Sequence, residues 1–181
     1  GKSSASANLY ILGARVYGTG ASVSGKNITI VGDASSAVSQ NNLGAWGTGI
    51  LWGASVSASG TIDITGTGGS TSSSSQNNYG INYVGGSIIG TGSGAVTLTG
   101  TGGGNSSSSN NDGINANGSA NSLIKTASGS LTLIGIAGSG SSSEGIALEQ
   151  GTIGAASGQS GSMILRADSI YFNNSQNIQT T

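Results

Sequence analysis

The chain lacks cysteine, histidine and proline altogether in a length of 181 residues. Without cysteine or histidine it cannot form a disulfide, activate a thiolate or build a zinc site of the usual ligand types. Charge is also scarce: 6% of the residues are charged and the net charge is −1, where a soluble domain has about a quarter charged. No basic patch is available for nucleic acid or an anionic membrane, and no apolar run is long enough to span a bilayer. We expect neither nucleic-acid binding nor membrane insertion.

Glycine, serine and asparagine dominate instead, with 35 glycines in the chain. Chains of this composition are often disordered, because they cannot bury enough apolar surface. Here, however, valine, isoleucine and threonine recur in regular clusters, and these residues favour β-strands. The composition therefore predicts short strands separated by tight turns.

One stretch that alternates apolar and polar residues between glycines, residues 93–100 (SGAVTLTG), has three near-copies. The copies are residues 24–32, 59–66 and 128–135. Equivalent apolar positions in the four copies lie 34, 34 and 35 residues apart, at Ile30, Ile64, Leu98 and Leu133. A fixed period of this length indicates a repeat architecture in which each repeat is one structural unit.

Each repeat continues with a Ser/Gly/Asn loop and two further short strands. The second strand begins with Gly-Ile, at residues 49–50, 80–81, 113–114 and 145–146. The third strand is marked in successive repeats by Val56, Ile88-Ile89, Leu123-Ile124 and Ile153. We place rungs of about 34 residues over 25–160 and shorter rungs over 1–24 and 161–181.

Stacking explains how such short strands can be stable. In a strand, successive side chains point to opposite faces, so Val96 and Leu98 point inward and Thr97 points outward. A single coil cannot bury its inner face, whereas stacked coils share one continuous core. The sequence therefore predicts an all-β right-handed parallel β-helix, a three-strand β-solenoid of about six rungs that spans 1–181 as a single segment.

Residues 96–103 (VTLTGTGG) and 62–69 resemble repeats of large bacterial exported β-helix proteins of the filamentous-haemagglutinin kind. Residues 164–170 and 177–181 are similar to the short rungs of those proteins. The resemblance covers nearly the whole chain. It implies a right-handed parallel β-helix, export by a two-partner or autotransporter route, and a role in adhesion, biofilm or surface filaments. On this basis we expect a secreted or bacterial cell-surface protein and a segment of a longer polypeptide.

Two carboxylates form the most chemical-looking pair in the chain. Asp112 and Glu144 each lie two residues before the isoleucine of a Gly-Ile strand, so they occupy one column on adjacent rungs. Their carboxylates are expected about 5 Å apart, near the separation in a retaining glycosidase. The alternative is a pair of solvated acids at a loop mouth. Because no other catalytic group accompanies them, we expect no enzyme activity, no cofactor and no resident metal; a calcium site formed with Asn110 and Asn111 remains an alternative.

A threonine-rich column offers a second candidate surface. Thr29, Asp63, Thr97 and Thr132 are predicted to point outward at equivalent positions of four rungs. A flat threonine array can bind ice or a polysaccharide, but threonine also simply suits an exposed strand. We also place Trp52 and Tyr83 in one inward column, as core residues or, if that strand faces outward, as a platform for sugars.

Taken together, these features predict a structural rod. Open rung edges pair with more chain, so we expect end-to-end self-association or further rungs, with host or matrix glycans as possible partners. The alternative is a ligand-binding module that takes ice or a polysaccharide on its flat threonine face.

Overall fold

The computed structural model describes residues 14–18, 20–36, 49–52, 54–69, 76–117, 123–154 and 161–179. In this part of the chain all regular secondary structure is β-strand. None of these residues forms a helix long and apolar enough to cross a membrane. The prediction of an all-β chain is confirmed.

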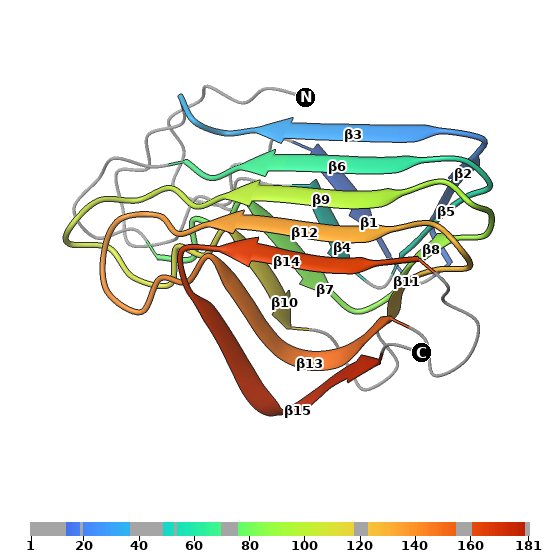
Figure 1. Ribbon diagram of the computed structural model, residues 1–181. Helices are drawn as coiled ribbons and strands as arrows, with labels where there is room; N and C mark the ends of the chain where they lie inside the picture. Colours follow the sequence, from blue (N-terminus) through green and yellow to red (C-terminus); the bar gives the residue numbers. More distant parts are fainter. Residues whose placement is uncertain are drawn as a thin grey trace.

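One sheet stacks five parallel strands in the order β14-β12-β9-β6-β3 (Figure 1). These strands are β3 (Ile28–Asp33), β6 (Ile62–Thr67), β9 (Val96–Thr101), β12 (Leu131–Ile136) and β14 (Met163–Ala167). Their register joins equivalent residues of successive repeats, so that Ile64 pairs with Leu98 and Leu98 with Leu133. The repeat alignment made from sequence is therefore the pairing alignment of this sheet.

The second sheet contains the other two strands of each coil. It includes β1 (Ala14–Tyr17), β2 (Ser22–Gly25), β4 (Gly49–Trp52), β5 (Ser55–Ala58), β7 (Ile81–Val84), β8 (Ser87–Gly90), β10 (Ile114–Asn117), β11 (Leu123–Thr126), β13 (Ile146–Gly154) and β15 (Ile170–Gln179). β13 pairs with both β10 and β11 and thereby runs across both halves of the sheet. Every pairing is parallel, and β15 pairs along β13.

This arrangement is a parallel β-solenoid, as the repeats predict. The described residues contain five rungs with all three strands, fewer than the six or so expected. The first strand of the remaining rung, expected at residues 8–11, lies outside the described residues. The N-terminal strands lie at one end of the stack, and β14 and β15 lie at the other (Figure 1).

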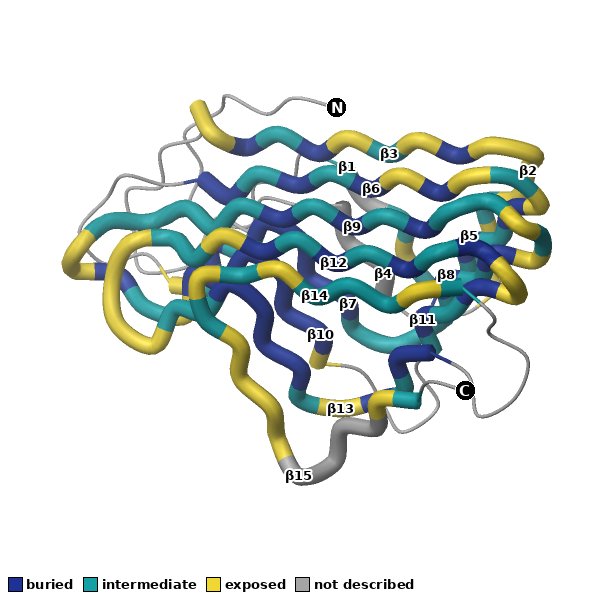
Figure 2. The backbone as a smooth tube through the Cα atoms, viewed as in Figure 1, coloured by how far each residue is buried: buried dark blue, intermediate teal, exposed yellow. Residues whose placement is uncertain are grey.

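The core follows the predicted alternation. Along β6, Ile62 and Ile64 are buried while Asp63 between them is exposed, and Figure 2 shows the same alternation of buried and less buried residues along β9. The inward residues of successive coils form one continuous apolar cluster. Burying one such aliphatic side chain contributes about 1.5–3 kcal/mol, so the stacked columns hold the coils together.

One register prediction is wrong. Tyr83 pairs with Leu51 rather than with Trp52, because Gly49 pairs with Ile81. The Gly-Ile motif is therefore displaced by one residue in this rung, and a one-residue shift exchanges the faces of a strand. Tyr83 is a core residue, as expected, whereas the Trp52 side chain lies outside the described residues.

The polar loops after β9 and β12 do not simply project from the rod. The Gly103 N–H donates to the Asn78 carbonyl at 2.8 Å, and the Gly138 N–H donates to the Asn111 carbonyl at 2.7 Å. Isolated parallel bridges join Gln76 to Ser109 and Ser109 to Ser141. The loops therefore extend the hydrogen-bonded stack beyond the strands.

In four strands of the first sheet, β3, β6, β9 and β12, the same position near the strand end is a glycine, whereas β14 has Ala167 there. The glycine permits a close backbone approach. A Cβ added to Gly100 would lie 2.0 Å from the carbonyl oxygen of Gly113, and one added to Gly66 would lie 1.9 Å from that of Gly80. No side chain fits at such distances. This column of glycines lets the end of a first-sheet strand lie close to the backbone just before the strand that positions the site described next.

Candidate functional site

The outer face of β7, β10, β13 and β15 carries one column of residues, three of which, Asn115, Ala147 and Tyr171, line a cleft. Asn82, Asn115, Ala147 and Tyr171 pair in sequence along it. They alternate with the inward isoleucine and tyrosine positions, so they project away from the core. Because Ala147 is small and stands between Asn115 and Tyr171, the column is hollowed at that point.

A second column lies two residues earlier, where the chain enters these strands. Asp112 and Glu144 occupy equivalent places in it, as the sequence predicts: the Gly113 N–H donates to the Glu144 carbonyl at 2.8 Å, and Ile114 pairs with Ile146. Tyr79 holds the same position one coil before Asp112. The structure therefore brings the predicted acid pair together beside the hollow at Ala147.

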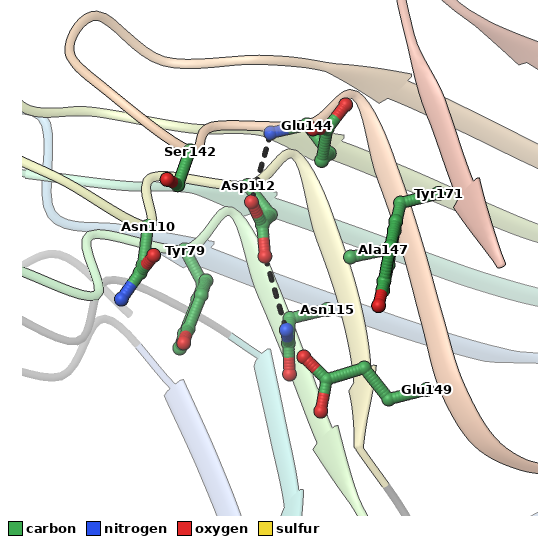
Figure 3. Close-up of a pocket in the computed structure, with 9 residues that line it drawn as sticks. All are labelled: Tyr79, Asn110, Asp112, Asn115, Ser142, Glu144, Ala147, Glu149 and Tyr171. Carbon is green, nitrogen blue, oxygen red and sulfur yellow. Dashed lines mark hydrogen bonds between the residues drawn. The ribbon is translucent and has the colours of Figure 1, made fainter. Parts of the chain in front are cut away.

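Between these columns the surface forms a cleft of about 350 Å³ (Figure 3). It is lined by Tyr79, Asn110, Asp112, Asn115, Ser142, Glu144, Ala147, Glu149 and Tyr171. Three of the six acidic residues of the chain are among them, and no lysine or arginine is. In a chain with so little charge, the cleft is the one described place where negative charge is concentrated.

Asp112 is the most deeply placed of the three acids, with 4% of its surface exposed. Its Oδ1 accepts the backbone N–H of Glu144 at 2.8 Å, and its Oδ2 accepts the Asn115 Nδ2–H at 3.0 Å (Figure 3). Burial raises the pKa of the Asp112 carboxyl above its ordinary value, and the negative charges of Glu144 and Glu149 add to this, while the two hydrogen bonds oppose it. The carboxylate therefore lies in a negative environment.

Tyr79 forms one wall of the cleft. Its hydroxyl donates to Asn77 Oδ1 at 3.1 Å. The pKa of this phenol lies well above its ordinary value because of burial and then the charges of Asp112 and Glu149. Tyr79 therefore remains a neutral phenol at physiological pH and offers a ring face and a hydroxyl rather than a phenolate.

The chemistry available to the cleft is binding by oxygen acceptors. Both oxygens of Asp112 are already hydrogen-bonded, which disfavours a nucleophilic role. Among the described residues no group of three or more Asp, Glu, His or Cys residues is placed to hold a metal ion. The calcium alternative also loses Asn111, whose Oδ1 accepts the Asn78 Nδ2–H at 2.6 Å inside the loop stack.

The threonine-rich column is present where the sequence places it. Thr29, Asp63, Thr97 and Thr132 stand in register on the outer face of the first sheet. Only Thr97 and Thr132 are adjacent threonines in that column, and Ile164 of β14 follows them. This face belongs to the first sheet, whereas the strands that line the cleft belong to the second. Ice or polysaccharide binding there stays a prediction.

Sequence reasoning missed the members of the cleft other than the acid pair and Asn110. Asn115 of the cleft and Asn82 one coil earlier each follow a Gly-Ile isoleucine, 33 residues apart, and this repetition is a readable signal for Asn115. No comparable signal in the sequence marks Glu149 or Tyr171. Their place in the cleft depends on an irregularity in register between β10 and β13 and on the pairing of β15 with β13.

No known protein family, no curated protein and no solved structure matches the chain. Its function is therefore inferred from its own fold, its open end and its cleft.

Proposed function

We propose that the chain is a structural β-solenoid rod, and that the coil formed by β14 and β15 is covered by a further coil, either of a second copy stacked end to end or of the same polypeptide. The resemblance to exported bacterial β-helix proteins supports a place outside the cell, as part of a surface filament, adhesin or matrix. In that role the rod supplies a stiff support, and the outer surface of its coils is available for contact with partners.

The observation that carries this proposal is the uncovered core at the C-terminal end of the stack. Ile170, Phe172 and Ile178 of β15 are 39%, 48% and 39% exposed. Their partners in the same inward columns one coil earlier are Ile146, Leu148 and Ile153. Those partners are 0%, 0% and 2% exposed, and Figure 2 shows the change from buried to exposed between β13 and β15.

The backbone at this end is open as well. In the described sheets β14 pairs only with β12, and β15 pairs only with β13. An unpaired strand edge attracts another strand, and exposed core side chains add apolar surface to be buried. This end therefore presents an unpaired strand edge and exposed core side chains, the two features by which one coil stacks on the next.

A second copy fits this end because its first coil has the same pattern. Val16 of β1 and Val23 of β2 stand in the inward columns that lead to Phe172 and Ile178. A copy placed one rung further along would continue both columns with apolar side chains, at the usual spacing of about 4.8 Å. Each aliphatic side chain fully buried in this way contributes about 1.5–3 kcal/mol.

Analytical ultracentrifugation and electron microscopy over a range of concentrations test the proposal. We expect rods that lengthen with concentration. Phe172→Lys places a charge in the proposed contact and should leave a monomer, whereas Ile136→Lys is a matched control because Ile136 is 50% exposed on the outer surface of β12. A wild-type chain that remains monomeric at every concentration would contradict end-to-end assembly.

A further inference from the structure

The cleft beside Asp112 has a composition that assembly of the rod does not use. It opens on the outer side of β7, β10 and β13, away from the inward columns that stack one coil on the next. Its lining carries three carboxylates and no lysine or arginine, and the Tyr79 hydroxyl donates to Asn77. The other polar side chains, those of Asn110, Asn115, Ser142 and Tyr171, can both donate and accept. The ligand that suits it therefore brings hydrogen-bond donors and positive charge.

The floor of the cleft is short of donors. Asn115 turns its Nδ2 to Asp112 and its Oδ1 to the opposite side (Figure 3). Because its Nδ2 donates to Asp112, Asn115 leaves its Oδ1 as the acceptor on this part of the floor.

The negative charge of the cleft also favours a cationic ligand. Asp112, Glu144 and Glu149 line the same cleft, and the charges of the two glutamates add to the burial that raises the pKa of the Asp112 carboxyl. No lysine or arginine lines the cleft to offset them. A cation bound in the cleft would offset these negative charges.

The shape favours an organic cation over a bare metal ion. The described residues offer no cluster of three acidic metal ligands, and the cleft holds about 350 Å³, far more than an ion requires. Tyr79 and Tyr171 stand on either side, and an aromatic face attracts an ammonium group and packs against the carbon frame that carries it. The small Ala147 between them leaves the room for that frame.

We propose that this cleft binds a protonated primary amine, with the ammonium group on the acidic side of the cleft beside Asp112 and its carbon frame between the two tyrosines. An ammonium has three donors and no acceptor, which matches the acceptor-rich floor. Such a group occurs on amino sugars and on polyamines, and the two sources differ in whether a sugar ring must fit beside Tyr171.

Isothermal titration of the full chain at pH 7 and low salt separates these sources. The probes are a glucosamine dimer, spermidine, the N-acetylated neutral form of the dimer, and calcium chloride alone. We expect one or both amines to bind at least tenfold more tightly than the neutral sugar, because a charge-assisted hydrogen bond is about twice as strong as a neutral one. Tighter binding of the dimer than of spermidine assigns an amino sugar, and the reverse assigns a polyamine.

Two variants and one control locate the site. Glu149→Gln removes one charge and should weaken amine binding about tenfold, and Ala147→Gln fills the hollow without changing the charge and should abolish binding. Asp63→Asn removes an exposed acid from the other sheet and should leave the affinity unchanged within about twofold. Circular dichroism confirms that each variant is folded.

The proposal is overturned by any of four results. These are no binding of either amine, equal binding of the neutral sugar, calcium that binds more tightly and displaces the amine, and equal losses in Glu149→Gln and Asp63→Asn.

Discussion

Replacement of Gly100 by alanine is the sharpest test of how these coils close. The added Cβ would lie 2.0 Å from the Gly113 carbonyl oxygen, 2.6 Å from its carbon and 2.8 Å from Ile114 Cγ1. Ordinary contacts of a Cβ begin at about 3.4 Å, so the two backbone segments must separate by more than an ångström. The same Gly113 oxygen accepts the Ile81 N–H at 2.8 Å, and separation weakens that bond as well.

The expected loss follows from these two effects. Forcing extra volume into a packed site costs about 1–3 kcal/mol, and one backbone hydrogen bond contributes about 0.5–1.5 kcal/mol net. Gly100→Ala should therefore lower the free energy of unfolding by about 2–4 kcal/mol. Gly25→Ala is the control, because the nearest atoms to its added Cβ are 3.8 Å away. There alanine restricts the unfolded chain and should stabilise the protein by about 0.4–1 kcal/mol.

Urea unfolding followed by circular dichroism measures both variants against the wild type, and unchanged slopes show that the midpoints report stability. The two substitutions should have opposite signs. If Gly100→Ala costs less than about 1 kcal/mol, or if it behaves like Gly25→Ala, the close approach of Gly100 to Gly113 does not require glycine and the reasoning is refuted.

Two further predictions concern the loop stack and the cleft. Asn111→Leu removes a buried amide that accepts from Asn78 and donates to Ser108 Oγ and the Ser139 carbonyl. It should lower the free energy of unfolding in urea by about 3 kcal/mol or more. A loss under about 1 kcal/mol would show that these hydrogen bonds between loops are dispensable. Because burial raises the pKa of Asp112 from 3.8, the folded state binds this proton more tightly, so stability should fall as pH rises from below 3.8 through the raised pKa. Asp112→Asn should remove that part of the slope in thermal unfolding against pH, and an unchanged slope would assign it to other groups.

The fold was largely readable from the sequence because a solenoid repeats local rules. The spacing of Ile30, Ile64, Leu98 and Leu133 is a pairing register, since each coil stacks on its own copy. Alternation within a strand then decides which side is core. The same logic failed for Trp52 and Tyr83, where one residue of displacement in a single rung changed the pairing. Sequence similarity between rungs locates a strand, but hydrogen bonding to its neighbours decides its register.

Much less of the cleft than of the fold could be predicted from the sequence. The sequence placed Asp112 and Glu144 in one column, because both precede a repeated Gly-Ile strand by the same number of residues. It could not show that the Asp112 carboxylate is satisfied by the backbone of Glu144 and by Asn115, nor that Glu149 and Tyr171 meet them. Those contacts depend on the irregular pairing of β10 with β13 and on where β15 lies.

The sequence by itself determined the repeat, the inward columns and the all-β class, because these depend on periodicity and on the alternation of side chains along a strand. Only the tertiary structure decided that the loops stack, that the inward columns end uncovered at β15, and that three acids face two tyrosines across one hollow. These features arise between coils, where the distance between side chains depends on register and loop path and is not written in the repeat.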